Sequence, residues 1–92
     1  MTYLTITLQI APQDRPAAVA IYHRYKQPFL DRIPGAKTKE LLVRDEDIQV
    51  LHGMTSKQSA ADYLQSDLFK ADVVTALTPL LKGAPDIRIY EN

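Results

Sequence analysis

The residues of this chain best suited to acid–base chemistry are its two histidines and five tyrosines. His52 lies on the apolar side of a short alternating stretch. A histidine titrates near pH ~6.5, so His52 is a candidate for moving a proton or binding a ligand. The competing interpretation is a structural role, in which a backbone group at the end of a strand holds the ring. His23 falls opposite the apolar face of a predicted helix and is expected at the surface.

A set of aromatic side chains at helical spacing is the second candidate. Tyr22, Tyr25, Tyr63 and Phe69 are predicted on or beside the faces of helices that turn toward a sheet. Such a set usually packs a core, but a buried phenol needs a hydrogen-bond partner, so several tyrosines together can also border a ligand cavity. We take all four as candidate ligand-binding residues, and Tyr63, with His52, as a candidate catalytic residue. We expect its hydroxyl to bond a polar group or water.

Several other chemistries find no support in the sequence. The chain has no cysteine, which excludes disulfides, thiolate nucleophiles and thiolate metal sites. The two histidines lack the close spacing of metal ligands, so no metal site is predicted. No glycine-rich phosphate loop and no Gly-x-Ser-x-Gly sequence is present. We therefore expect no metal and no cofactor.

Composition and charge are those of an ordinary globular protein. The 92 residues predict one domain, and their formal net charge is zero. Basic residues gather in 15–44 and acidic ones in 45–92, a distribution better explained by a solvated basic face than by a nucleic-acid site. The N-terminus alternates and lacks a basic, apolar leader, so neither a signal peptide nor a membrane span is expected. The predicted location is the cytoplasm.

Alternating apolar residues predict strands at 3–10, 37–44, 48–52 and 86–90. A helix follows the first strand, with Asp14 as its N-cap and Pro16 in its first turn. Pro28 is expected to kink or end this helix near Gln27, because it removes one backbone hydrogen bond. Gly53 is expected to close the third strand, and Ile87 in the fourth to point inward.

The stretch 54–82 predicts a long second helix, the element around which the chain is organised. Thr55 and Gln58 have the spacing of a capping box, and Ser66 with Asp67 is expected to restart the helix after a bend. Gly83 is the candidate residue after its C-terminus. The apolar positions of this helix are Ala60, Leu64, Leu68, Val73, Leu77 and Leu81.

The resulting order β-α-β-β-α-β predicts an α+β fold of the ferredoxin-like type. In that fold a four-stranded antiparallel sheet carries two helices on one face. The other face stays uncovered, and a chain this short buries only roughly 60–65% of its unfolded surface, so we expect this face to form a homodimer interface. Its predicted residues are Tyr3, Thr5, Thr7, Gln9, Gln49, Leu51, Arg88 and Tyr90.

One short stretch carries a family resemblance. Ser56-Lys57-Gln58 is followed by a Tyr-Leu-x-Ser-Asp-x-Phe-Lys run starting at Tyr63, and the last strand reads Ile-Arg-Ile-Tyr-Glu. This combination resembles the antibiotic biosynthesis monooxygenase superfamily of dimeric α+β barrels. The resemblance implies a homodimer with a pocket between helices and sheet in each protomer. Members include oxygenases of aromatic polyketides that use no metal or flavin, haem-degrading enzymes, and proteins of unknown activity.

The family's functional residues carry over only in part. Haem-degrading relatives use an asparagine, a tryptophan and a haem-binding histidine; the positions that correspond are Thr7, Tyr63 and Val73, so haem degradation is not expected. The polyketide oxygenases combine asparagine, tryptophan, tyrosine and arginine, of which only tyrosine and arginine candidates are present here. The resemblance thus implies either a cofactor-independent monooxygenase of a small, aromatic substrate or a non-catalytic ligand-binding or regulatory protein.

RNA binding is a third hypothesis, because RNA-recognition motifs share the βαββαβ order. Those motifs place stacking aromatic residues on the third strand. Here that strand reads Ile-Gln-Val-Leu-His, without an aromatic ring, so a nucleic-acid partner is not expected.

Overall fold

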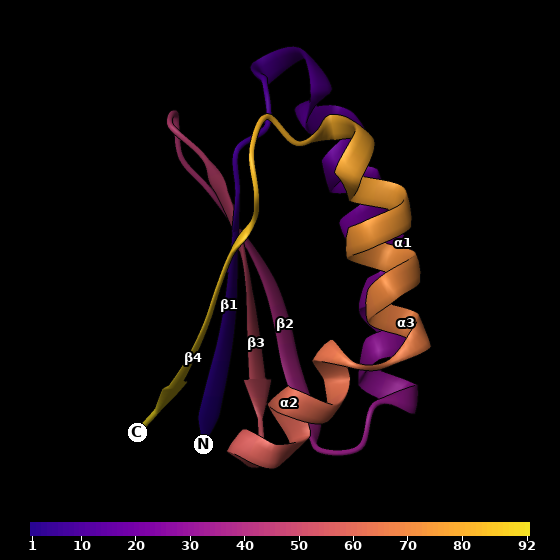
Figure 1. Ribbon diagram of the computed structural model, residues 1–92, viewed down its shortest axis with the longest axis vertical. Coiled ribbons are helices and arrows are strands. Elements are labelled where there is room, and N and C mark those ends of the chain that lie inside the picture. The colour runs from indigo at the N-terminus through magenta and orange to yellow at the C-terminus, as the bar shows by residue number, and fades with distance from the viewer.

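A computed structural model describes all residues, Met1–Asn92. Four antiparallel strands form one sheet in the order β2-β3-β1-β4, and the helices lie together on one of its faces (Figure 1). The predicted ferredoxin-like α+β fold is therefore confirmed, while the dimeric barrel stays a prediction. The elements are β1 (Thr2–Leu8), η1 (Pro12–Asp14), α1 (Arg15–Arg32), β2 (Ala36–Val43), β3 (Ile48–Met54), α2 (Lys57–Leu64), α3 (Asp67–Phe69), η2 (Lys70–Leu77), η3 (Thr78–Leu80) and β4 (Asp86–Glu91).

The central strand β1 shows why the alternation in the sequence gives a two-faced sheet. Leu4, Ile6 and Leu8 are at most 1% exposed and lie under the helices. The residues between them point to the opposite face, where Gln49 Nε2 of β3 donates to Thr7 Oγ1 at 3.0 Å. Since successive side chains of a strand alternate between faces, one strand supplies both the core and the open face.

Helix α1 does not end at Gln27, one of the two outcomes predicted for Pro28. It continues through Pro28 to Arg32. Proline costs a helix one backbone hydrogen bond, but the turn that follows Pro28 holds Phe29, which is 0% exposed. Burial of that ring in the core offsets the missing bond. Asp14 precedes the helix as predicted, but its side chain forms no capping hydrogen bond.

The predicted second helix is divided into segments. The N-cap is Ser56, whose Oγ accepts from Ser59 N at 3.0 Å, rather than Thr55 in a capping box with Gln58. The predicted restart is confirmed: α2 ends at Leu64, and Ser66 caps α3 by accepting from Phe69 N at 3.1 Å. The chain then continues as a π-helical turn, η2, and a 3₁₀ turn, η3.

The structure differs from the prediction at two glycines, Gly53 at the end of the third strand and Gly83 after the second helix. Strand β3 continues past Gly53 to Met54, because Gly53 pairs with Tyr3 of β1. Gly83 does not adopt a left-handed conformation; the only positive φ in the chain is 84° at Gly35. A Cβ at Gly35 would collide with Ser59 and Thr55, so the turn between α1 and β2 requires glycine.

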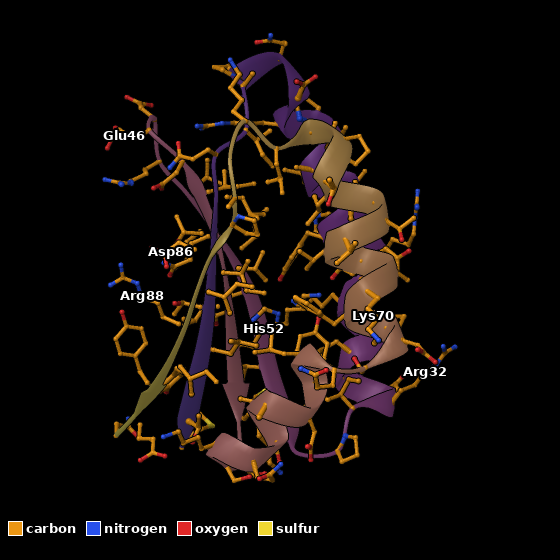
Figure 2. The ribbon with its side chains drawn as sticks, viewed as in Figure 1. Arg32, Glu46, His52, Lys70, Asp86 and Arg88 are labelled. Carbon is orange, nitrogen blue, oxygen red and sulfur yellow. The ribbon has the colours of Figure 1, made fainter.

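The edge strand β4 is less covered than expected. Ile87 is paired with the buried Ile6 and so points to the helix-covered face, as predicted, but it is 39% exposed because the helices lie over the other strands of the sheet (Figure 1). Figure 2 shows His52 between sheet and helices, whereas Asp86 and Arg88 project from the opposite face. No helix is both long enough and apolar enough to cross a membrane.

Candidate functional site

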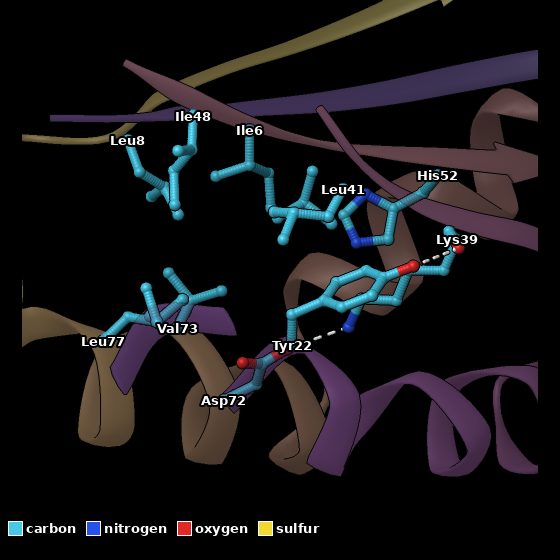
Figure 3. Close-up of a pocket in the computed structure, with 12 residues that line it drawn as sticks. Ile6, Leu8, Tyr22, Lys39, Leu41, Ile48, His52, Asp72, Val73 and Leu77 are labelled. Carbon is cyan, nitrogen blue, oxygen red and sulfur yellow. Dashed lines mark hydrogen bonds and ion pairs between the residues drawn. The ribbon is translucent and has the colours of Figure 1, made fainter. Parts of the chain in front are cut away.

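Four polar side chains from four different elements meet between the sheet and the helices (Figure 3). They are Tyr22 of α1, Lys39 of β2, His52 of β3 and Asp72 of η2, and each is at most 7% exposed. Lys39 and His52 come together because they are paired across β2 and β3, beside a β-bulge between Ala36 and Thr38. All four line one cavity, whose remaining walls are apolar.

Lys39 and Asp72 form a buried ion pair. Lys39 Nζ lies 3.1 Å from Asp72 Oδ2, and the two side chains are 1% and 6% exposed. Burial lowers the pKa of Lys39 and raises the pKa of Asp72, since both charges lose their hydration, while the attraction between them opposes each shift. The ammonium also lies 5.4 Å from the centre of the Phe29 ring. A cation is thereby fixed in an apolar site.

His52 is held by the backbone of the central strand. Its Nδ1 lies 3.0 Å from the carbonyl oxygen of Leu4, the residue opposite it in β1. A carbonyl only accepts, so Nδ1 carries the hydrogen and Nε2 is the basic nitrogen, without a hydrogen bond. Burial, and then the charge of Lys39, lowers the pKa of His52 from 6.5 to about 3, against the effect of the Leu4 bond. The ring is neutral at physiological pH.

Tyr63 belongs to the core rather than to the cavity wall. Its ring is 1% exposed, and its centre lies 4.9 Å from that of Phe29 and 5.4 Å from those of His52 and Phe69. Its hydroxyl has no hydrogen-bond partner, where a polar group or water was expected. Burial, and secondly the charge of Asp72, raises the pKa of this phenol.

The predicted site residues therefore divide into two groups. His52 and Tyr22 line the cavity, and the Tyr22 hydroxyl donates to the backbone oxygen of Lys39 at 2.7 Å. Tyr63 and Phe69 pack behind it and do not line it. Tyr25 is half-buried and does not line it either.

The cavity is small. Nine of its 12 lining residues are hydrophobic, and its volume is about 10 Å³. A single water molecule needs roughly 10–15 Å³, so an aromatic ligand requires the walls to move apart. No group of three histidine, aspartate or glutamate side chains is placed to hold a metal ion.

Sequence reasoning missed Lys39 and Asp72, the two charged members of the site. Lys39 lies two residues before Leu41 in a strand, and Asp72 lies three residues after Phe69 in a helix. The available signal was that each of these charged residues falls on the apolar face of its strand or helix. Its partner could not be identified, because 33 residues separate the pair along the chain.

Of the positions assigned from the family resemblance, one lines the cavity and another lies on the opposite face of the sheet. Val73 lines the cavity. Thr7, assigned to the asparagine position, lies on the open face with Gln49 and cannot reach the cavity. The Thr7 side chain points away from the cavity because successive strand residues point to opposite faces of the sheet.

Comparison with known proteins gives the same fold. No protein-family model and no curated protein matches the sequence. A solved structure from Caulobacter crescentus, described as a "putative antibiotic biosynthesis monooxygenase", superimposes with a TM-score of 0.85 at 20% identity over 99% of this chain and 88% of that one. A protein of the same description from Nitrosomonas europaea gives 0.84 at 10% identity over 100% and 98%.

The haem-degrader MhuD from Mycobacterium tuberculosis, solved with two haems in its active site, gives a TM-score of 0.78 at 14% identity over 100% of this chain and 95% of that chain. Identities this low establish the fold and not the activity. The chain thus has the fold of proteins described as antibiotic biosynthesis monooxygenases, which confirms at the level of fold the resemblance inferred from its sequence.

Proposed function

We propose that this protein is a cofactor-independent monooxygenase of the antibiotic biosynthesis type, acting on a small, planar, aromatic substrate with an acidic C–H group. The observation that supports it is the basic Nε2 of His52 at the wall of an apolar cavity, beside the buried ammonium of Lys39. A base next to a fixed positive charge is suited to forming a carbanion whose charge moves onto oxygen.

The reaction balances without an external reductant. His52 Nε2 takes a proton from a methylene carbon beside a carbonyl or phenol, and Lys39 stabilises the resulting oxyanion. This anion reduces molecular oxygen, and the new carbon–oxygen bond gives a peroxide at the same carbon. Loss of water from the peroxide, with return of the proton from His52, converts the CH₂ group and O₂ to a C=O group and H₂O.

The low pKa of His52 bears directly on this step. A pKa of about 3 makes the ring a weak base, because burial and Lys39 both disfavour its charged form. A substrate anion between them would oppose the Lys39 charge and raise the pKa of His52 toward neutrality. Substrate acidity and histidine basicity would therefore rise together.

We also propose that residues 1–92 act as one domain that forms a homodimer through the open sheet face. A polar hollow on that face is lined by Thr5, Thr7, Gln49, Arg88 and Tyr90, among others. These residues lie on three neighbouring strands, which provides a continuous surface for a second copy. Tyr90 is 49% exposed, so an aromatic side chain is available for such a contact.

Oxygen uptake with anthrone, which carries such a methylene group, tests the enzymatic proposal. His52→Ala should lower the rate by roughly 10²–10⁴-fold, the usual contribution of general base catalysis. The matched control is His23→Ala, since His23 is the other histidine and is exposed. No uptake by the wild-type protein, or equal rates in both variants, would contradict the proposal.

The non-catalytic alternative is favoured by one specific observation, the cavity volume of about 10 Å³. A binding protein whose cavity opens only when a high-affinity ligand binds needs no large cavity in the absence of that ligand. A ligand that raises the melting temperature without being turned over would identify this class.

A further inference from the structure

The ion pair in the cavity wall is poorly satisfied. Lys39 has three N–H donors, but its side chain makes one hydrogen bond, to Asp72 Oδ2 at 3.1 Å. That bond is also the only one that the Asp72 carboxylate accepts. Buried charged groups usually have several partners, and such exceptions call for an explanation.

A third buried polar group nearby is entirely unpartnered. The Tyr63 hydroxyl has no hydrogen bond, and Tyr63 is 1% exposed. Its ring is in contact with that of His52, which lines the cavity with Lys39 and Asp72. Tyr63 itself does not line the cavity, so it is the unused donors of Lys39, in the cavity wall, that indicate a site built for an additional group.

We propose that the ligand of this cavity is a planar apolar molecule with one anionic oxygen group, and that this group replaces the Asp72 carboxylate as the counter-ion of Lys39. The inference rests on the proposed function only in taking the same cavity as the ligand site. It goes further by assigning the ligand's charge and the residue that recognises it.

Charge balance requires the exchange. Two anions beside one ammonium in an apolar site would leave one negative charge without a partner, which is strongly unfavourable. Asp72 lies on the π-helical segment η2, whose Val74 is 53% exposed, so this segment borders water on its outer side. Figure 3 shows Asp72 and Val73 on one side of the cavity and the sheet residue Ile6 on the other, so an outward turn of η2 would move Asp72 toward water and widen the cavity.

Equilibrium binding of naphthoate and naphthamide tests this inference, because the two differ only in the anionic group. The wild-type protein should bind naphthoate at least about tenfold more tightly, as expected for a hydrogen bond to a charged group. Lys39→Met should abolish that preference. Asp72→Asn should bind naphthoate about tenfold more tightly than wild type while binding naphthamide equally, since the competing carboxylate is gone.

Lys26→Met is the matched control. Lys26 Nζ lies 5.8 Å from the centre of the Tyr22 ring, comparable to the 6.0 Å of Lys39, but Lys26 does not line the cavity. This variant should keep the preference for naphthoate. Equal binding of both ligands by the wild-type protein, no binding at millimolar concentration, or a preference that survives Lys39→Met would overturn the inference.

A measurement on the wild-type protein covers the case in which a variant does not fold. The carboxyl ¹³C resonance of Asp72 should shift with naphthoate and stay in place with naphthamide, and naphthoate binding without that shift would also overturn the inference. Naphthoate has no acidic C–H group, so this outcome is independent of oxygen uptake. If oxygen uptake is absent but naphthoate binds with the expected preference and the Asp72 shift, only the proposed enzyme activity is contradicted, and the exchange of counter-ions stands.

Discussion

Replacing Tyr63 with phenylalanine should stabilise the protein. The ring is 1% exposed and in edge-on or tilted contact with three other rings, all of which phenylalanine can keep. Only the hydroxyl is lost, and it is buried without a partner. A buried hydroxyl without a hydrogen bond costs about 1–3 kcal/mol. We expect Tyr63→Phe to raise the free energy of unfolding by about 1 kcal/mol, the lower end of that range.

Urea unfolding at a fixed protein concentration measures this change, because association would otherwise shift the midpoint. In a thermal melt, about 1 kcal/mol corresponds to roughly 4–8 °C for a domain of this size. Tyr63→Ala is the companion variant, and loss of the packed ring should cost about 3–5 kcal/mol. A Tyr63→Phe protein that is destabilised by about 1 kcal/mol would refute the reasoning, since it would mean that the hydroxyl is hydrogen-bonded.

Three further predictions concern separate parts of the molecule. Because folding lowers the pKa of His52 from 6.5 to about 3, the stability that its neutral form contributes is present above pH 6.5 and lost as the pH falls. Below about pH 6 the unfolding free energy should fall by about 1.4 kcal/mol per pH unit more steeply in wild type than in His52→Leu; equal slopes in acid titrations would contradict the shift. Ser66→Ala and Ser56→Ala should each cost about 1 kcal/mol in urea unfolding, since both hydroxyls cap helices; Ser66→Ala should cost more, because Ser66 Oγ also donates to Tyr63 O at 2.6 Å. Leu51→Glu should dissociate the proposed dimer in sedimentation experiments, at a cost of several kcal/mol, while Val74→Glu on the helical face should not; an unchanged dimer would place the interface elsewhere.

The fold was predictable because each strand carries a clear alternation and each helix a clear apolar face. The errors occur where packing overrides a local rule. Pro28 is a helix breaker by local chemistry, yet the helix continues because Phe29 in the next turn is buried. Ser56 rather than Thr55 caps α2, a shift of one residue that capping patterns alone could not resolve.

The candidate site was predictable only in part. His52 and Tyr22 could be proposed from residue type and predicted face, and both line the cavity. The pairing of Lys39 with Asp72 depends on how η2 and β2 are placed relative to each other in the folded chain, which no local pattern specifies. Whether an aromatic side chain borders the cavity or packs behind it is likewise decided by tertiary packing, as Tyr22 and Tyr63 show.

His52 connects the stability of the protein with the proposed chemistry. One side of its ring contacts Phe29 and Tyr63, at centroid distances of 5.0 and 5.4 Å, and the ring also lines the cavity. Its Nδ1 bond to Leu4 fixes the tautomer, so the core determines which nitrogen is basic. A core substitution that lets the ring rotate would break this bond, and the site would lose its oriented base while the fold persists. Buried neighbours of His52 are therefore positioning residues for the site as well as members of the core.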